Sequence, residues 1–237
     1  MKEILKLRSF LFLLVAGSLA AGSLLGLSGP VAAQTGNFEG FCAARLEIDN
    51  AEGRKATLTA LDQLVATAPA AVTEPMTALR TLYQKKGGDA FESKKGFALI
   101  SQLDSYIYEN CSGQKVAATA IDYQFQGVPS TLAAGRTYFK LTNNAPKEDH
   151  EMGIVKLRPA GEGMDVEELL SMPEKKLGKY VDFQNATGMF APPGQSGYAA
   201  TTLTQGTYVY ACFIPVGGKR NGKPHFTQGM YGTFTAG

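Results

Sequence analysis

The chain has 237 residues, of which 23 are lysine or arginine and 21 are aspartate or glutamate, for a formal net charge of +2. This length allows one large domain or two small ones. A charge balance close to zero provides no basic surface for nucleic acid or for an anionic membrane, so we expect neither as a partner.

The first 33 residues have the pattern of a secretory signal peptide. A basic start is followed by an apolar run over residues 9–27 and by a small-x-small motif that ends at Ala33. We therefore expect cleavage near Ala33 and export to the periplasm or the cell exterior. An uncleaved membrane anchor is the alternative, because the apolar run is nearly long enough to span a bilayer. After cleavage 20 basic and 20 acidic residues remain, and no later stretch is apolar enough to cross a membrane.

Residues 34–113 are expected to form a small helical domain. Four apolar stripes at helical spacing lie in this region, and helices that each bury one stripe pack as a bundle. The third helix is expected to be capped by Thr73, with Pro75 in its first turn. The fourth is expected to run from about Asp89 through Ile107.

The pattern changes after residue 113 to short β-type runs separated by turn signals. Seven or so such runs are typical of a two-sheet antiparallel sandwich, which we expect over residues 114–237. The expected strands cover residues 116–125, 136–141, 150–157, 180–183, 198–203, 207–214 and 231–235. The predicted fold class is therefore α+β, with a helical bundle before an antiparallel β-sandwich.

Three cysteines occur in the chain, an odd number for an exported protein. Cys42 and Cys111 lie on apolar helix faces at the two ends of the bundle, so we expect them to form a disulfide. Cys212 is then left as a lone thiol in the strand-rich region. It is either a buried, unreactive side chain or a metal ligand.

Other soft and borderline ligands in the sequence favour the interpretation of Cys212 as a metal ligand. Cys212 closes a strand-like run, and His225 and Met230 follow it. The other histidine of the chain, His150, lies at a junction between a loop and a strand. Two histidines, a cysteine and a weakly bound axial methionine are the ligands of a blue copper site.

The region from about Lys115 to the C-terminus, about half of the chain, resembles the cupredoxins, the family of plastocyanin and azurin. The resemblance lies in the order of His150, Cys212, His225 and Met230 and in the His-x4-Met spacing of the last two. The whole chain also resembles secreted bacterial proteins that carry a small helical domain before a cupredoxin-like domain. The resemblance implies a copper cofactor, one-electron transfer with a redox partner protein, and no enzymatic activity. We expect a monomer.

Two features depart from the family pattern. Twelve residues separate Cys212 from His225, more than in small blue copper proteins, and Glu151 follows the first histidine where asparagine is usual. We expect the loop over residues 213–224 to fold outward and to return His225 to the site. Imidazole nitrogens should then lie within about 4 Å of the Cys212 sulfur, given ordinary metal–ligand lengths. The basic residues of this loop could steer an acidic redox partner, although a flexible connection is the simpler interpretation.

Other functions compete with electron transfer. The protein could carry Cu(I) between a copper donor and an acceptor, with Met152 as a second thioether. The His2Cys set could bind zinc with a water molecule, or Cys212 and His225 could form a nucleophilic pair. The domain could also be a cupredoxin-fold binding module without metal. Multicopper enzymes need more histidines than the two in this chain.

Overall fold

The computed structural model describes residues 38–219 and 221–237. The predicted signal peptide, residues 1–33, and its cleavage point at Ala33 lie outside the described residues, and so does Arg220 of the expected basic loop. Within the described part of the chain, no helix has both the length and the apolar character that a membrane crossing requires.

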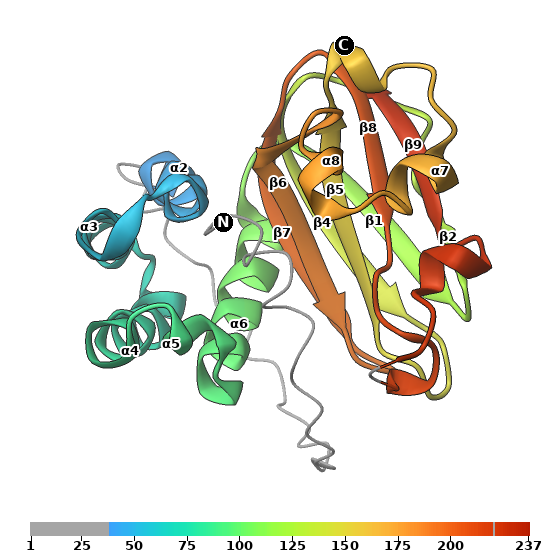
Figure 1. The fold of residues 1–237 in the computed structure, drawn as a ribbon. Helices are drawn as coiled ribbons and strands as arrows, with labels where there is room; N and C mark the ends of the chain where they lie inside the picture. Colours follow the sequence, from blue (N-terminus) through green and yellow to red (C-terminus); the bar gives the residue numbers. More distant parts are fainter. Residues whose placement is uncertain (1–37, 220) are drawn as a thin grey trace.

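Helices form the first part of the fold and lie together on one side of a sandwich of strands (Figure 1). The helices are α2 (Phe38–Asn50), α3 (Gly53–Thr67), α4 (Ala70–Lys86), α5 (Asp89–Glu92) and α6 (Lys94–Asn110). Each of the longer helices buries an apolar stripe against its neighbours, as amphipathic helices do. The expectation of helices followed by a β-sandwich is confirmed.

Two details of the helices differ from the sequence-based prediction. The third helix, α4, begins at Ala70, directly after Pro69, so Thr73 lies inside it and donates a hydrogen bond to the Pro69 carbonyl at 2.9 Å. The fourth helix is broken at Ser93, which is extended and caps α6 by accepting a hydrogen bond from Gly96 N. The break brings Gly96 so close to α5 that a Cβ there would lie 1.8 Å from the Ala90 carbonyl oxygen.

The predicted disulfide between Cys42 and Cys111 is present, with Cα atoms 5.9 Å apart. It joins α2 to the residue that follows α6, three residues before the first strand begins at Gln114. The crosslink therefore holds the first and last long helices of the bundle together at the point where the chain enters the sandwich. Cys212 is free and buried.

The strands form two sheets. One has the order β2-β1-β4-β7, from Gln124–Gln126, Gln114–Ile121, Gly135–Asn143 and Ser196–Leu203. The other has the order β3-β9-β8-β5-β6, from Thr131–Leu132, Tyr231–Ala236, Gly206–Ala211, His150–Leu157 and Val181–Ala191. Both sheets are mixed rather than purely antiparallel, because β1 pairs with β4, and β3 with β9, in parallel.

Short helices complete the sandwich. Two helices, α7 (Val166–Leu170) and α8 (Glu174–Leu177), and the 3₁₀ turn η1 (Pro159–Gly161) connect β5 to β6. Two further 3₁₀ turns, η2 (Val216–Gly218) and η3 (His225–Gln228), lie between β8 and β9. Asp165 caps α7 as expected, since its Oδ1 accepts a hydrogen bond from Glu168 N at 2.8 Å.

The core of the sandwich and the contact with the helices use opposite faces of β4. Phe139 and Leu141 point between the two sheets, whereas Tyr138 belongs to the buried cluster of the helices. This alternation follows from the two-residue period of a strand. Across the same boundary, Phe97 of α6 meets Phe190 of β6 in a T-shaped contact, with ring centroids 5.8 Å apart. Whether residues 34–113 and 114–237 fold as separate domains stays a prediction.

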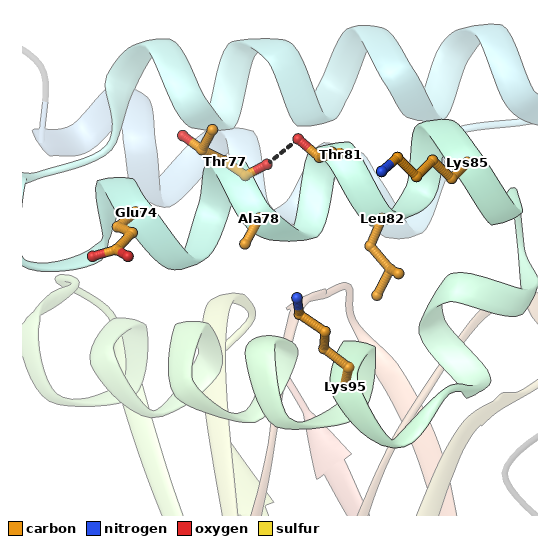
Figure 2. A pocket seen from close by; sticks show the side chains of 7 residues that line it. All are labelled: Glu74, Thr77, Ala78, Thr81, Leu82, Lys85 and Lys95. Carbon is orange, nitrogen blue, oxygen red and sulfur yellow. Dashed lines mark hydrogen bonds between the residues drawn. The ribbon is translucent and has the colours of Figure 1, made fainter.

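A shallow surface depression lies between α4 and α6, where Lys95 faces the side chains of α4 (Figure 2). The hydroxyl groups of Thr77 and Thr81 donate hydrogen bonds to carbonyls one turn earlier in α4, so the helix itself satisfies them. The depression is lined only by residues of the helices, and none of the candidate metal ligands contributes to it.

Candidate metal centre

Three neighbouring strands place the predicted ligands at one end of the second sheet. His150 is the first residue of β5, Cys212 follows the last residue of β8, and Met230 precedes β9. His225 begins η3, between β8 and β9. Because β9, β8 and β5 are adjacent in the sheet, residues far apart in the sequence meet at this end (Figure 1).

The long loop after Cys212 is a closed hairpin. At its base, the Cys212 carbonyl accepts a hydrogen bond from Phe226 N, and the Ile214 carbonyl accepts one from His225 N, both at 2.9 Å. These bonds continue the pairing of two antiparallel strands beyond the end of β8. The loop therefore leaves the sheet and returns His225 to the side of Cys212.

The hairpin stays paired further out. Pro215 and Pro224 form an antiparallel bridge, and Val216 N donates a hydrogen bond to the Lys223 carbonyl at 3.0 Å. Gly222 fits under this turn only because it has no side chain, since a Cβ would lie 2.7 Å from the Val216 carbonyl oxygen. The additional length of the loop is thus accommodated away from the metal ligands.

His150, Cys212 and His225 bring one nitrogen, one sulfur and one nitrogen within 4.8 Å of one another, and all three residues are completely buried. The Nδ1 atoms of the two histidines are 3.2 Å apart, and Cys212 Sγ is 3.4 Å from His225 Nδ1. Ligands bonded to one ion at about 2.0 Å for nitrogen and about 2.3 Å for sulfur lie at about this separation from each other. The donor atoms and their spacing therefore fit a single soft or borderline metal ion.

The backbone of Met230 is hydrogen-bonded to two of these residues. Its N–H donates to the His225 carbonyl at 3.3 Å, and its carbonyl accepts from Cys212 N at 3.1 Å. The Met230 side chain is completely buried in the core between the sheets. Met230 is therefore fixed next to the cluster, and its role as an axial ligand stays a prediction.

The pocket disfavours charge on all three groups. Burial lowers the pKa of His150 to about 4, with a further contribution from His225, and burial lowers the pKa of His225 as well. Burial, followed by the nearby Glu151 carboxyl, raises the pKa of the Cys212 thiol. The neutral imidazoles and the thiol therefore offer lone pairs to a site that has no positive charge. A bound cation would favour the thiolate form of Cys212.

Glu151, which stands where the cupredoxin pattern has asparagine, contacts Cys212 and the residue after it. Its backbone N–H points to Cys212 Sγ, at 3.5 Å, and its Oε1 accepts a hydrogen bond from Phe213 N at 3.0 Å. Burial raises the pKa of the Glu151 carboxyl to about 7, against the opposing effect of the Phe213 N–H. The side chain thus holds the segment that carries Cys212 against the start of β5.

Aromatic side chains lie around the site. Phe213 and Phe226 make a T-shaped contact with ring centroids 5.4 Å apart, and Phe226 is buried. Tyr123, from the turn between β1 and β2, lies edge-on to His225 with ring centroids 4.9 Å apart. Tyr123 could not be predicted from the sequence, because a tyrosine in a turn carries no signal for which loop it contacts.

The C-terminal part of the chain is thus a two-sheet sandwich with a buried His2Cys cluster at one end, and it is similar to blue copper proteins. An auracyanin from the photosynthetic bacterium Roseiflexus castenholzii is 20% identical, with 53% of this chain and 98% of that chain covered and a TM-score of 0.36. Rusticyanin is 22% identical, with 53% and 81% covered and a TM-score of 0.31. A copper-containing nitrite reductase from Thermus scotoductus is 12% identical, with 52% and 31% covered and a TM-score of 0.29. No protein-family model and no curated protein sequence matches the chain.

Proposed function

We propose that the protein is an exported copper protein that transfers single electrons through a type 1 copper site. His150, Cys212 and His225 would hold the copper, and Met230 would be a further, weaker ligand. The observation that carries the proposal is the convergence of three buried donor atoms, two nitrogens and one thiol sulfur, within 4.8 Å of one another. Copper bound there would supply a one-electron Cu(II)/Cu(I) couple.

The surroundings of these side chains support electron transfer rather than substrate chemistry. Backbone hydrogen bonds at the base of the hairpin fix His225 and Cys212, which would limit rearrangement of the site between two oxidation states. The three ligand residues have no solvent-exposed surface, so a substrate could not reach them without movement of the surrounding side chains. The chain has two histidines, and both are in the cluster, so none is left for a catalytic copper.

Burial also argues against the nucleophilic alternative. The pKa of Cys212 is raised by burial, whereas a nucleophilic cysteine needs a lowered pKa and an exposed position. The zinc alternative uses the same three ligands with water in the fourth position. Complete burial of the cluster argues against that water.

Export is supported by the disulfide between Cys42 and Cys111, because disulfides persist in oxidising compartments. We propose the predicted signal peptide as the route of export. A redox partner protein would exchange electrons with the mature chain, which we expect to be a monomer.

Delivery of Cu(I) is the second candidate function, because thioethers lie close to the ligands in the fold. Met152 is on the same face of β5 as His150 and faces Met189 of β6, and both methionines are buried. A carrier could use these sulfurs and need not depend on Cys212. A cupredoxin-fold module without metal remains the third candidate.

Metal analysis and visible spectroscopy of the mature protein separate these functions. We expect one copper per chain and intense visible absorption after addition of Cu(II), and loss of that absorption in Cys212→Ser. Delivery becomes the better function if Cys212→Ser keeps full Cu(I) affinity while Met152→Ala loses it. Failure of the wild-type protein to retain any copper would favour the metal-free module.

A further inference from the structure

The imidazole of His225 has one nitrogen in the cluster and one outside it. Nδ1 faces His150 and Cys212, so Nε2 points away from the candidate metal position. Nε2 is buried and has no hydrogen-bond partner at ordinary distance. The Glu148 carboxylate lies next to it, with Oε2 at 3.6 Å from His225 Nε2. This separation is slightly longer than a hydrogen bond.

Glu148 is held in place from two directions. Both of its carboxylate oxygens accept from Gly217 N, at 3.0 and 3.2 Å, which ties the side chain to the hairpin. Its backbone carbonyl accepts a hydrogen bond from Asn143 Nδ2 at 2.8 Å, and the same amide group also donates to the Ala191 carbonyl. The carboxylate therefore connects a fixed point before β5 with both the hairpin and the ring of His225.

The two histidines differ in this respect. His150 Nε2 is also buried without a hydrogen-bond partner. The carboxyl group next to His150 in the sequence, Glu151, is bonded to Phe213 N instead. Among the described residues, His225 is the histidine whose outer ring nitrogen has a carboxylate next to it. The two imidazoles therefore differ in whether a carboxylate lies next to Nε2.

We propose that Glu148 is a positioning residue for His225. By accepting a hydrogen bond from Nε2–H, it favours the tautomer that leaves Nδ1 free for a metal. Its bonds to Gly217 N link this tautomer to the closed hairpin. Carboxylates that orient a metal-bound imidazole in this way are a general device of metal sites, and they also make the ligand more basic. The part of the proposal that concerns copper rests on the function proposed above.

A metal-free measurement tests the tautomer. Long-range ¹H–¹⁵N NMR of the histidine side chains in the copper-free protein should show His225 with its proton on Nε2. Glu148→Gln keeps an acceptor oxygen and should retain that tautomer, whereas Glu148→Ala should move at least about a third of the population to the Nδ1-protonated form. Glu47→Gln, which changes an exposed glutamate on α2, is the matched control.

A second measurement uses the copper-loaded protein. A negative charge near the metal favours Cu(II) over Cu(I), so its removal should raise the reduction potential. We expect both Glu148 variants to change the ratio of Cu(II) to Cu(I) binding constants by about tenfold, which corresponds to about 59 mV for one electron. The control should not change it. If the variants bind no copper but the tautomer shifts, the positioning role stands and the copper function falls.

The proposal is overturned if Glu148→Ala retains the wild-type tautomer, or if the potentials of both variants match that of Glu47→Gln. Loss of the Gly217 hydrogen bonds could loosen the hairpin in Glu148→Ala. Glu148→Gln can keep one of them, so it provides the comparison in a closed hairpin. A shift in potential without any difference in tautomer between the variants would also count against the positioning role.

Discussion

The Nδ1 atoms of His150 and His225 lie 3.2 Å apart in the core, although the two residues are 75 positions apart in the sequence. Two neutral imidazoles can share only one proton along that line, and the thiol of Cys212 is 3.4 Å from the same His225 nitrogen. The two imidazoles and the thiol cannot all satisfy their hydrogen-bonding groups with one another, and a buried polar group without a partner is costly. A bound metal ion, as proposed above, would account for their arrangement.

The first prediction concerns the hairpin that returns His225. Gly222→Ala places a methyl group 2.7 Å from the Val216 carbonyl oxygen, which forces the turn to open. Because overpacking of this kind costs about 1–3 kcal/mol, we expect several-fold faster proteolytic cleavage between residues 216 and 223 and weaker copper binding. Limited proteolysis with mass spectrometry measures the first effect.

Gly88→Ala is the control for this substitution. Gly88 has an ordinary helical backbone, and a Cβ there meets no atom within 4 Å. Equal cleavage rates in the two alanine variants would show that the hairpin is not packed as described.

The second prediction concerns the disulfide. Replacement of Cys42 and Cys111 by alanine removes a crosslink between residues that are 69 positions apart. We expect the free energy of unfolding to fall by about 2–5 kcal/mol, the usual effect of such a loss. Denaturant unfolding measures it, with the visible spectrum of the copper site unchanged. A loss below about 1 kcal/mol would mean that the crosslink does not constrain the unfolded chain as the entropic account requires.

The third prediction concerns a buried ion pair in the helical part. Arg45 Nη2 bonds to Asp104 Oδ2 at 3.0 Å, and both residues are buried. Asp104→Asn leaves the guanidinium without its main partner, so we expect a loss of about 3–5 kcal/mol in the free energy of unfolding.

The double replacement Arg45→Met and Asp104→Leu should cost less than Asp104→Asn alone, because no buried charge is left uncompensated. The exposed pair of Asp62 and Arg80 is the control, and Asp62→Asn should cost less than about 1 kcal/mol. If Asp104→Asn is as mild as Asp62→Asn, loss of the carboxylate does not leave a costly uncompensated charge on Arg45.

The fourth prediction concerns pH in the metal-free protein. The pKa of His150 falls from its ordinary 6.5 to about 4 on folding, so stability is lost as pH decreases through this range. The pKa of Glu151 rises from 4.5 to about 7, so its contribution to stability is present below pH 4.5 and is lost as pH increases. Between pH 4.5 and 6.5 the two effects oppose each other.

Glu151→Gln removes the second effect. Between these pH values, its free energy of unfolding should rise with pH more steeply than that of the wild type, by up to about 1.4 kcal/mol per pH unit. Urea unfolding at a series of pH values measures both slopes. Parallel curves for the two proteins would contradict the raised pKa of Glu151.

Local sequence patterns predicted most element types. β5 occupies His150–Leu157, as its run of β-type residues indicated, and Asp165 caps α7. The strand expected over residues 116–125 is instead two antiparallel strands, β1 and β2, joined by a turn. The parallel pairing of β1 with β4 could not be predicted, because a strand pattern specifies which face is buried and not which neighbour is bonded. The break at Ser93 depends on how α5 and α6 pack around Gly96, a tertiary feature.

In the candidate site, too, some residues could be predicted from the sequence and others could not. Residue chemistry alone indicated His150, Cys212 and His225, because few side chains bind soft metals. Glu148 was missed, since a carboxylate in the polar run before His150 is indistinguishable from ordinary loop charge. Its contact with His225 exists only because the hairpin folds back over it through Gly217.

The most direct test of the account is X-ray absorption spectroscopy at the copper K-edge of the loaded protein. One copper per chain should be bound by one sulfur at about 2.2–2.3 Å and two nitrogens at about 2.0 Å, close to the bond lengths of other His and Cys sites. Cys212→Ser should remove the short sulfur contact and leave the nitrogens. A wild-type spectrum with only oxygen and nitrogen neighbours would contradict the assignment of His150, Cys212 and His225 as a type 1 copper site.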